Sequence, residues 1–258
     1  MPVRVERDGR GVATIIVDRE AKLNALDSPT VEALTAAAIE AARDAELRAV
    51  VLRGAGARAF IGGADIPEMG ALSGPGAART FITRVHRACD ALRRVPVPVI
   101  ARIDGYALGA GLEIAASCDM RIAGAAAVFG MPEVRIGLPS VVEAALLPGL
   151  IGWGRTRRLL LTGVTIGAAQ ALAWGLVEEV ADAGKLDGAV EAVLASILAS
   201  GPACVRLQKE LISAWEELPL RDAVRRGIDV FATAWEGEEP RRMIAGFLDD
   251  KRRRKRPA

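Results

Sequence analysis

This sequence of 258 residues has few aromatic side chains, few cysteines and a single histidine. Phe, Trp and Tyr make up 4% of the chain, although 51% of its residues are hydrophobic. Much of that apolar content is alanine, which favours tightly packed helices over an aromatic-rich all-β core. The three cysteines, Cys89, Cys118 and Cys204, are widely spaced and have no histidine cluster beside them. They indicate neither a disulfide framework nor a zinc site, and we expect reduced thiols in the core.

The chain also lacks a strong net charge and long apolar runs. Its 34 basic and 32 acidic residues leave a formal charge of +2, too little to indicate nucleic-acid binding by bulk charge. No uncharged apolar run reaches about 18 residues, the length needed to span a membrane as a helix. The N-terminus carries acids and no apolar core, unlike a signal or transit peptide. We therefore expect a soluble, cytoplasmic protein with no membrane partner.

What the sequence does contain is a strand-rich first half and a helical second half. Alternating or β-branched runs predict strands at 3–7, 12–18, 48–53, 97–103 and 120–122. A loop rich in Gly and Pro is expected at 62–76. Apolar spacing and capping residues predict helices at 28–42, 79–94, 109–118, 141–150, 155–161, 168–174, 186–200, 202–215, 221–235 and 240–253. The pattern indicates an α/β core followed by a helical region.

Three segments rich in small residues, 60–69, 104–114 and 129–139, hold the side chains that could carry chemistry. Small residues let backbone N–H groups approach a ligand closely. Two such N–H groups could hold a carbonyl oxygen as an enolate while a carboxylate, Glu113 or Glu133, moves a proton at the neighbouring carbon. Spacing alone does not establish that the segments converge. The alternative is that they are ordinary turns with two solvated or ion-paired glutamates.

Several motifs in these segments occur together in one known family. They are Lys22-Leu-Asn-Ala-Leu26, Gly63-Ala-Asp-Ile66, Gly105-Tyr-Ala-Leu-Gly109, Met131-Pro-Glu133, Leu161-Thr-Gly163 and Ala173-Trp-Gly-Leu-Val177. Because these motifs occur in this order, the chain resembles the enoyl-CoA hydratase/isomerase (crotonase) family over nearly its full length. The resemblance implies an α/β fold with a crotonase-like ββα spiral core over residues 1–200. It further implies a C-terminal helical trimerisation region with a basic tail over 201–258, and homotrimers or hexamers built as dimers of trimers.

The resemblance also implies roles for individual residues. The backbone N–H groups of Ala64 and Ala110 would form an oxyanion hole, although the family commonly has glycine at the second position. Glu113 would activate water, and Glu133 would deliver a proton to Cα. Six residues would contact the acyl-CoA substrate: Asp65 and Ile66 beside the acyl-pantetheine arm, Lys22 and Leu23 near the nucleotide, and Phe231 and Lys251 from the C-terminal helices. No metal or redox cofactor is implied, because coenzyme A enters as the substrate thioester.

The sequence departs from the family pattern at three places near the site. Pro67 stands where the family has a lysine, which removes one possible phosphate contact. The segment 139–143 replaces a glycine-rich turn, and within it Val141 occupies the position where dienoyl isomerases and a dehalogenase use aspartate. We expect Glu143 to be an exposed glutamate at a helix start. His86 is expected on the solvated surface of its helix.

The expected reaction is that of a lyase, the reversible hydration of a 2-trans-enoyl-CoA to a 3-hydroxyacyl-CoA. Double-bond isomerisation or retro-Claisen cleavage is the alternative within the family. A dinucleotide-binding loop at 109–114 is disfavoured, because isoleucine stands at the third small position. The six basic residues at 251–256 leave polyanion binding as the non-enzyme alternative, although no aromatic residue for base stacking is interleaved with them.

Overall fold

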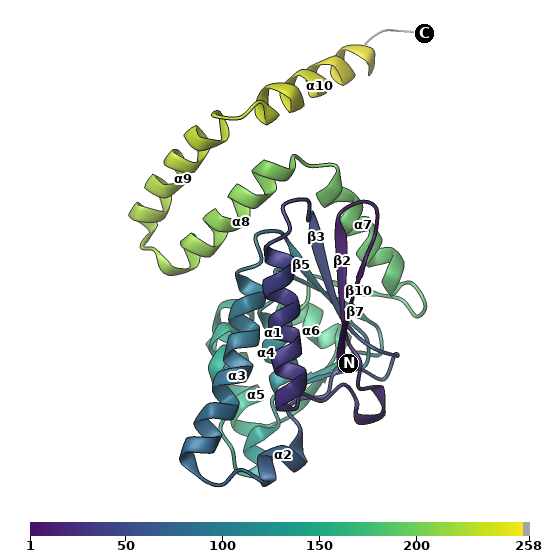
Figure 1. Ribbon diagram of the computed structural model, residues 1–258, viewed down its shortest axis with the longest axis vertical. Helices are drawn as coiled ribbons and strands as arrows, with labels where there is room; N and C mark the ends of the chain where they lie inside the picture. Colours follow the sequence, from purple (N-terminus) through teal and green to yellow (C-terminus); the bar gives the residue numbers. More distant parts are fainter. Residues whose placement is uncertain (255–258) are drawn as a thin grey trace. The chain divides into compact units, whose positions relative to one another are not determined.

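The structure is a computed structural model that describes residues 1–254. It divides the chain into two compact units, Met1–Leu194 and Ala195–Ala258. The first unit contains two β-sheets and their covering helices, and the second is helical. Figure 1 shows both units, coloured along the sequence.

The larger sheet has six strands in the order β1-β2-β3-β5-β7-β10. Their bounds are Val3–Arg7 (β1), Val12–Val17 (β2), Ala49–Gly54 (β3), Val99–Ile103 (β5), Met120–Gly124 (β7) and Glu179–Ala181 (β10). β1 and β2 form the predicted antiparallel hairpin, and every other neighbouring pair is parallel. Parallel strands are covered on both faces, which explains the near-continuous apolar runs of β3 and β5.

A smaller sheet has four strands of three residues each, in the order β4-β6-β8-β9. They are Ala59–Ile61 (β4), Tyr106–Leu108 (β6), Val128–Gly130 (β8) and Thr165–Gly167 (β9). β4, β6 and β8 are parallel neighbours, and β9 runs antiparallel to β8. The carboxyl ends of β4, β6 and β8 therefore lie along one edge of this sheet.

The chain alternates between the two sheets, with helices after each pair of strands. β3 and β4 precede α2 and α3, β5 and β6 precede α4, and β7 and β8 precede η2, η3 and α5. The helical bounds in the first unit are Ser28–Ala42 (α1), Ile66–Gly70 (α2), Pro75–Arg93 (α3), Ala110–Ala116 (α4), Glu133–Ile136 (η2), Val142–Leu146 (η3), Leu147–Thr162 (α5) and Ala168–Trp174 (α6). α7 (Leu186–Leu198) crosses into the second unit. The repeated strand-strand-helix order confirms the predicted spiral.

α1 shows how local sequence sets these helices. The Asp27 carboxylate accepts a hydrogen bond from the Thr30 N–H (3.0 Å), and Pro29 fits the first turn, where an N–H is not needed. Val31, Leu34 and Ala38 recur at helical spacing and are buried. α1 and α3 lie side by side in Figure 1, the two long helices of the first unit nearest its N-terminal strands.

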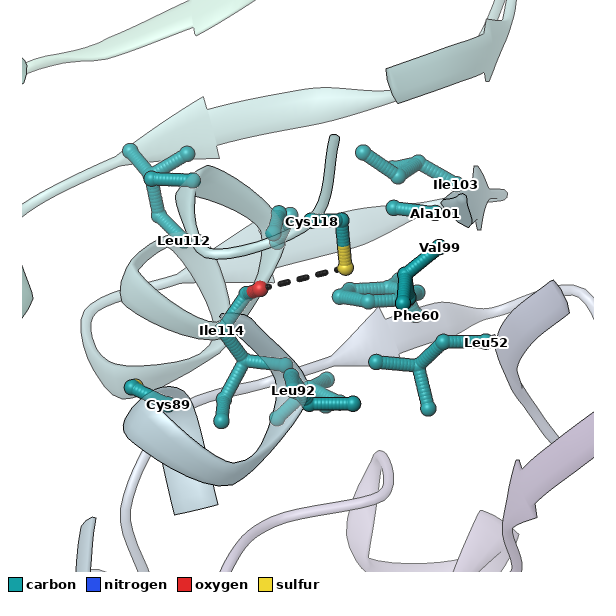
Figure 2. Close-up of a cluster of buried hydrophobic side chains, with 14 of the residues drawn as sticks. Leu52, Phe60, Cys89, Leu92, Val99, Ala101, Ile103, Leu112, Ile114 and Cys118 are labelled. Carbon is teal, nitrogen blue, oxygen red and sulfur yellow. Dashed lines mark hydrogen bonds between the residues drawn. The ribbon is translucent and has the colours of Figure 1, made fainter. Parts of the chain in front are cut away.

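The core of the first unit is apolar and contains two of the three thiols (Figure 2). Cys89 and Cys118 are buried, and the Cys118 thiol donates to the Ile114 carbonyl at 3.4 Å. Phe60 of β4 is fully buried opposite side chains of β5. Cys204 is exposed, so the expectation of a core thiol was wrong there, because it lies in the first turn of a helix in the second unit.

The structure corrects two other local predictions. The predicted loop at 62–76 contains the short helix α2 and the first residues of α3. The helix predicted at 141–150 is instead the 3₁₀ helix η3 followed by α5, which continues to Thr162 across a non-helical Gly152 (φ 77°). Proline at the start of α2 and α3 reads as a loop signal in sequence, although it is also favoured in the first turn of a helix.

The second unit consists mainly of three helices, α8 (Pro202–Glu217), α9 (Leu220–Ala234) and α10 (Glu239–Arg254). The Glu239 carboxylate accepts from the backbone N–H groups of Ala203 (3.1 Å) and Cys204 (2.8 Å), and so ties α10 to the start of α8. Trp215 Nε1 donates to the Ala223 carbonyl at 3.0 Å and joins α8 to α9. Of the basic run 251–256, the last two residues lie outside the described residues.

Within residues 1–254, no single helix has the length and apolarity needed to cross a membrane, and only α7 and α8, taken together as a bent pair, meet those criteria.

Candidate active site

A cavity of about 240 Å³ opens at the carboxyl ends of β4, β6 and β8. Its lining includes four residues that the sequence singled out for chemistry: Ala64, Ala110, Glu113 and Glu133. The remaining walls are mostly apolar. Adjacent parallel strands end at one sheet edge, and this brings together loops that lie far apart in the sequence. The three small-residue segments therefore converge, which their spacing alone did not establish.

The backbone N–H of Ala64 lies in a loop that neighbouring hydrogen bonds hold in place. The Gly63 carbonyl accepts from the Leu26 N–H (2.8 Å), and the Asp65 N–H donates to the Leu26 carbonyl (2.9 Å). Gly63 has a φ of +116°, a backbone conformation that glycine adopts without strain because it has no Cβ. Among the described residues, the Ala64 N–H between these two contacts has no hydrogen-bond acceptor.

The second N–H belongs to Ala110, the first residue of α4. Before it, the Gly109 N–H donates to the Gly130 carbonyl (2.9 Å), which joins β6 to β8. The Leu112 N–H then donates to the Gly109 carbonyl (2.8 Å). No acceptor within residues 1–254 faces the Ala110 N–H. Two residues of the cavity lining, on two different loops, therefore have backbone N–H groups without an acceptor among the described residues.

Glu113 lies on the first turn of α4 and is 3% exposed. Burial raises the pKa of Glu113 to about 8, and the negative charge of Glu133 contributes to the rise. The backbone N–H groups of Ala144 and Val141 oppose it, because they stabilise the ionised form. The buried site therefore favours the protonated form of Glu113 more than water does.

Glu133 follows β8 and begins η2. The Ser140 hydroxyl donates to its Oε2 at 2.7 Å. Its Oε1 occupies the space beside Gly109, where a Cβ would collide with it. Gly109 has a φ of +52°, so this position needs glycine both for its backbone and for the room it leaves. The sequence motif Gly105–Gly109 thus positions the glutamate of the next loop.

The structure overturns the expectation for Glu143. Its side chain is buried, with the residue 8% exposed, and its Oε1 lies 2.7 Å from Nδ1 of His86. His86 lies on the surface of α3, as expected, but its side chain is only half exposed and has this buried partner. A 3₁₀ turn places Glu143 on the inward side, which helical spacing alone did not predict.

The residues expected to touch the substrate fall into two groups. Ile66 lines the cavity, whereas Lys22, Leu23 and Asp65 are not among its lining residues. Lys22 is exposed, and the Leu23 carbonyl accepts from the Gly62 N–H (2.8 Å), so both lie near the loop of Ala64. Their contacts with CoA stay a prediction.

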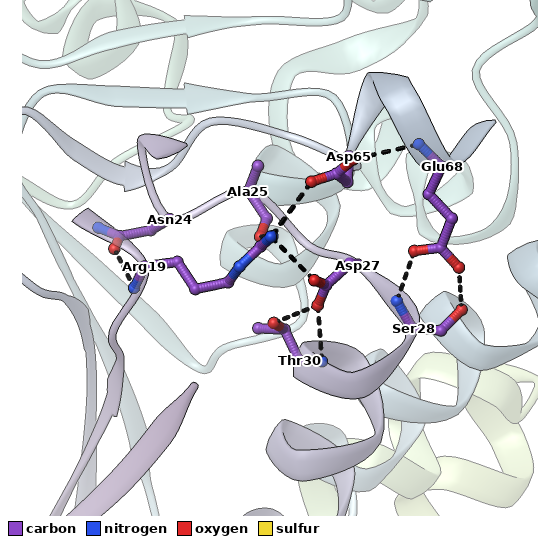
Figure 3. Close-up of polar contacts among 8 residues, drawn as sticks. All are labelled: Arg19, Asn24, Ala25, Asp27, Ser28, Thr30, Asp65 and Glu68. Carbon is purple, nitrogen blue, oxygen red and sulfur yellow. Dashed lines mark hydrogen bonds and ion pairs between the residues drawn. The ribbon is translucent and has the colours of Figure 1, made fainter. Parts of the chain in front are cut away.

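The Asp65 carboxylate belongs to a polar network that the sequence did not reveal (Figure 3). The Arg19 guanidinium lies 2.8 Å from Asp27 Oδ2 and 3.3 Å from Asp65 Oδ2. Asp65 Oδ1 also accepts from the Glu68 N–H (3.1 Å) and caps α2. The Glu68 carboxylate accepts from the Ser28 N–H at 2.8 Å. The network thus joins the start of α1 to α2, directly after Ala64.

Phe231 and Lys251 belong to the second unit, where both are exposed. Their predicted contacts with CoA also stay a prediction. In the described part of the chain, no three His, Cys, Asp or Glu side chains are grouped as a metal site would require.

Comparison with known proteins gives consistent similarities along the chain. The family model described as enoyl-CoA hydratase/isomerase matches residues 7–255. The short-chain-enoyl-CoA hydratase of Clostridium acetobutylicum is 33% identical over 253 residues, covering 97% of this chain and 95% of that protein. The crotonyl-CoA hydratase of Syntrophomonas wolfei is 31% identical and covers 93% of each. The crystal structure of a Mycobacterium smegmatis enoyl-CoA hydratase superposes with a TM-score of 0.94, at 30% identity and 97% coverage of both chains.

Proposed function

Because the chain belongs to the enoyl-CoA hydratase/isomerase family, we propose that it catalyses the reversible hydration of a 2-trans-enoyl-CoA to a 3-hydroxyacyl-CoA. One observation carries this proposal: two glutamates and two free backbone N–H groups line the same cavity. Hydration requires a base for the water and an acid for Cα, and it also requires stabilisation of the enolate formed between these steps.

In this proposal the thioester oxygen binds at the N–H groups of Ala64 and Ala110. Water adds to Cβ, the electron pair moves to that oxygen, and the two donors stabilise the resulting enolate. Protonation at Cα then gives the 3-hydroxyacyl product. Loss of one such donor costs about a hundredfold to a thousandfold in turnover in acyl-transfer enzymes.

The two glutamates would share the proton transfers. One must be ionised and the other protonated, and the raised pKa of Glu113 supports a pair that keeps one proton at neutral pH. We assign water activation to Glu113 and proton delivery to Glu133. The reacting water, held between them, lets the shared proton pass from Glu113 to Glu133. Ser140 would keep Glu133 in place through its hydrogen bond to Oε2.

We further propose a short acyl group as the substrate's acyl chain. Its volume is about 240 Å³, and Met69, Phe81 and Val85 contribute apolar side chains to its walls. The names of the Clostridium and Syntrophomonas relatives, short-chain-enoyl-CoA hydratase and crotonyl-CoA hydratase, support the same choice. We therefore propose crotonyl-CoA or a similar short thioester as the substrate.

The proposal also covers the cofactor requirement, the compartment and the oligomeric state of the enzyme. The reaction needs no metal or redox cofactor, since both protons come from water and carboxyl groups. We place the enzyme in the cytoplasm as a homotrimer or a dimer of trimers. An apolar stripe along α9 supports assembly, with exposed side chains at Leu220, Val224, Ile228, Phe231 and Trp235.

The test is a hydration assay of the full-length protein, followed by the loss of absorbance of the conjugated enone. Crotonyl-CoA should react faster than hexadecenoyl-CoA. Glu113→Gln and Glu133→Gln should each reduce hydration by about a hundredfold to ten-thousandfold, because each removes general acid–base catalysis. Glu40→Gln, a change on the exposed surface of α1, serves as the matched control. Full turnover in Glu113→Gln, with activity lost only in Glu133→Gln, would contradict hydration and favour double-bond isomerisation by one carboxylate.

A further inference from the structure

The turn formed by residues 140–144 contacts both glutamates of the cavity. The Ser140 hydroxyl donates to Glu133 at 2.7 Å. Val141 lines the cavity together with Glu113, and η3 packs against α4, the helix that carries Glu113. This one turn therefore supplies a hydrogen bond to Glu133 and part of the cavity wall beside Glu113.

The backbone of this turn is strained. Val142 has a φ of +38°, in the left-handed region that a β-branched residue rarely adopts. Such a conformation persists only where the surrounding structure fixes it. Val142 lies between Val141 and Glu143 in the chain. Contacts made by these neighbours must therefore stabilise its strained backbone.

Glu143 supplies such a contact from the inner side of the turn. Its Oε1 lies 2.7 Å from Nδ1 of His86 on α3. Its Oε2 is buried and, within the described residues, has no hydrogen-bond partner. The Cys89 thiol lies on the same side, and its pKa is raised well above its usual value, first by burial and then by the Glu143 carboxylate. His86 thus supplies a directed polar contact to Glu143 at 2.7 Å.

Neither His86 nor Glu143 is among the residues that line the cavity. Substrate binding thus does not explain why a carboxylate is buried here. The contact instead joins α3 to the turn that carries Ser140, Val141 and Ala144.

We propose that His86 and Glu143 form a positioning pair, in which Nδ1–H of His86 donates to Glu143 and holds the strained turn against the two catalytic glutamates. This inference rests on the proposed function for its effect on turnover. The pair acts through the turn: Ser140 stays hydrogen-bonded to Glu133, and Val141 keeps its place in the cavity wall beside Glu113.

The first experiment compares His86→Ala with His86→Asn in the hydration assay. The alanine variant should lower kcat by about tenfold to a hundredfold, since a displacement of about 1 Å at catalytic groups has effects of this size. KM for crotonyl-CoA should stay within about twofold of wild type, because neither residue lines the cavity. Asparagine places an N–H₂ donor near the position of Nδ1 and should restore most of the lost kcat. Arg87→Ala, the adjacent exposed residue on α3, is the matched control.

Two results would overturn the pair. One is a wild-type kcat in His86→Ala, and the other is a His86→Asn variant no better than His86→Ala. The double variant His86→Ala/Glu143→Ala should lose no more kcat than the worse single variant, since both remove the same contact. A loss equal to the product of the two single effects would also contradict the proposal.

A second measurement separates this inference from the reaction itself. His86 is the only histidine, so its imidazole ¹⁵N resonances need no assignment. Glu143→Gln keeps the shape of the side chain but replaces the carboxylate with an amide, and the Nδ1 resonance should shift. An unchanged Nδ1 resonance would overturn the pair whatever the activity. A shifted resonance in a protein that hydrates no enoyl-CoA would support the pair and refute the proposed reaction.

Discussion

Glu113 is an acidic side chain that the fold makes difficult to ionise. It is 3% exposed, lies near the charge of Glu133, and has its pKa raised from 4.5 to about 8. In the unfolded chain this glutamate would titrate near its ordinary value. Between about pH 4.5 and 8 the folded state therefore binds more protons at this position than the unfolded state does.

This difference predicts how stability changes with pH. The contribution of Glu113 is fully present below about pH 4.5 and is lost as pH rises through about 8, with an upper bound of about 5 kcal/mol for the whole shift. Glu113→Gln cannot ionise and should escape this loss. The Tm of the variant minus the Tm of the wild type should therefore increase as the pH is raised from 5 to about 9. Thermal melts of both proteins across this range, with Glu40→Gln as control, measure it.

A Tm difference that stayed constant with pH would show that Glu113 ionises in the folded protein as it does in the unfolded chain. The raised pKa assigned to its buried position would then be wrong.

Single residues also show what the sequence could and could not predict. Glu113 and Glu133 were identified from motifs, and both line the cavity. The inward position of Glu143 was missed, because it depends on a 3₁₀ turn with a left-handed valine that no apolar spacing encodes. The sequence does not reveal the role of Arg19 either, since the guanidinium joins Asp27 to Asp65, which is distant in sequence.

At the level of elements, prediction depended on length. The long helices and five strands of the larger sheet, β1, β2, β3, β5 and β7, have enough residues for a recognisable pattern, and the sequence predicts them, whereas the three-residue β10 is not predicted. β4, β6, β8 and β9 have three residues each, too few for such a pattern. The convergence of three loops depends on those short strands, so family resemblance predicts the site, whereas the spacing of residues does not.

The Arg19 network is an element-scale feature with a testable effect. Its ion pairs to Asp27 and Asp65 join α1 to α2, and the loop of Ala64 lies between β4 and α2. Arg19 is partly buried, with 20% of its side chain exposed. Arg19→Ala leaves two neighbouring carboxylates without their shared cation, which should loosen the loop. We expect kcat for hydration to fall about tenfold and Tm to decrease by several degrees.

Arg19→Lys provides the comparison, since lysine keeps the charge but cannot bond two carboxylates with a planar fork. Arg19→Lys should restore a larger share of the Tm lost in Arg19→Ala than of the kcat lost in that variant. Equal kcat in all three proteins, measured with the same crotonyl-CoA assay, would show that the network does not position the Ala64 N–H.

At the level of the whole molecule, the second unit carries an apolar surface that one chain leaves exposed. Ile228 is 66% exposed and Phe231 is 70% exposed, and both belong to the stripe along α9. A stripe of large apolar side chains at helical spacing is typical of an interface. We expect sedimentation velocity to give a mass of about three or six times 27.1 kDa for the wild-type protein.

Ile228→Asp should shift this mass toward that of a single chain, because burying an unpaired carboxylate in an apolar interface is costly. Arg221→Glu, an exposed change near the start of α9, should leave the assembly intact. An unchanged mass for Ile228→Asp would show that the stripe lies outside the interface.

The shared edge of β4, β6 and β8 has a consequence for how such proteins diversify. Each strand ends in its own loop, and in the proposed reaction each loop contributes its own groups: the Ala64 N–H from the first, the Ala110 N–H and Glu113 from the second, and Glu133 from the third. The strands fix where each group stands, whereas the loop residues are free to change identity. A substitution in one loop can therefore alter the acid, the base or the anion-binding groups while the others keep their positions. Selection can explore new acyl-CoA chemistry on this scaffold one loop at a time, without rebuilding the fold.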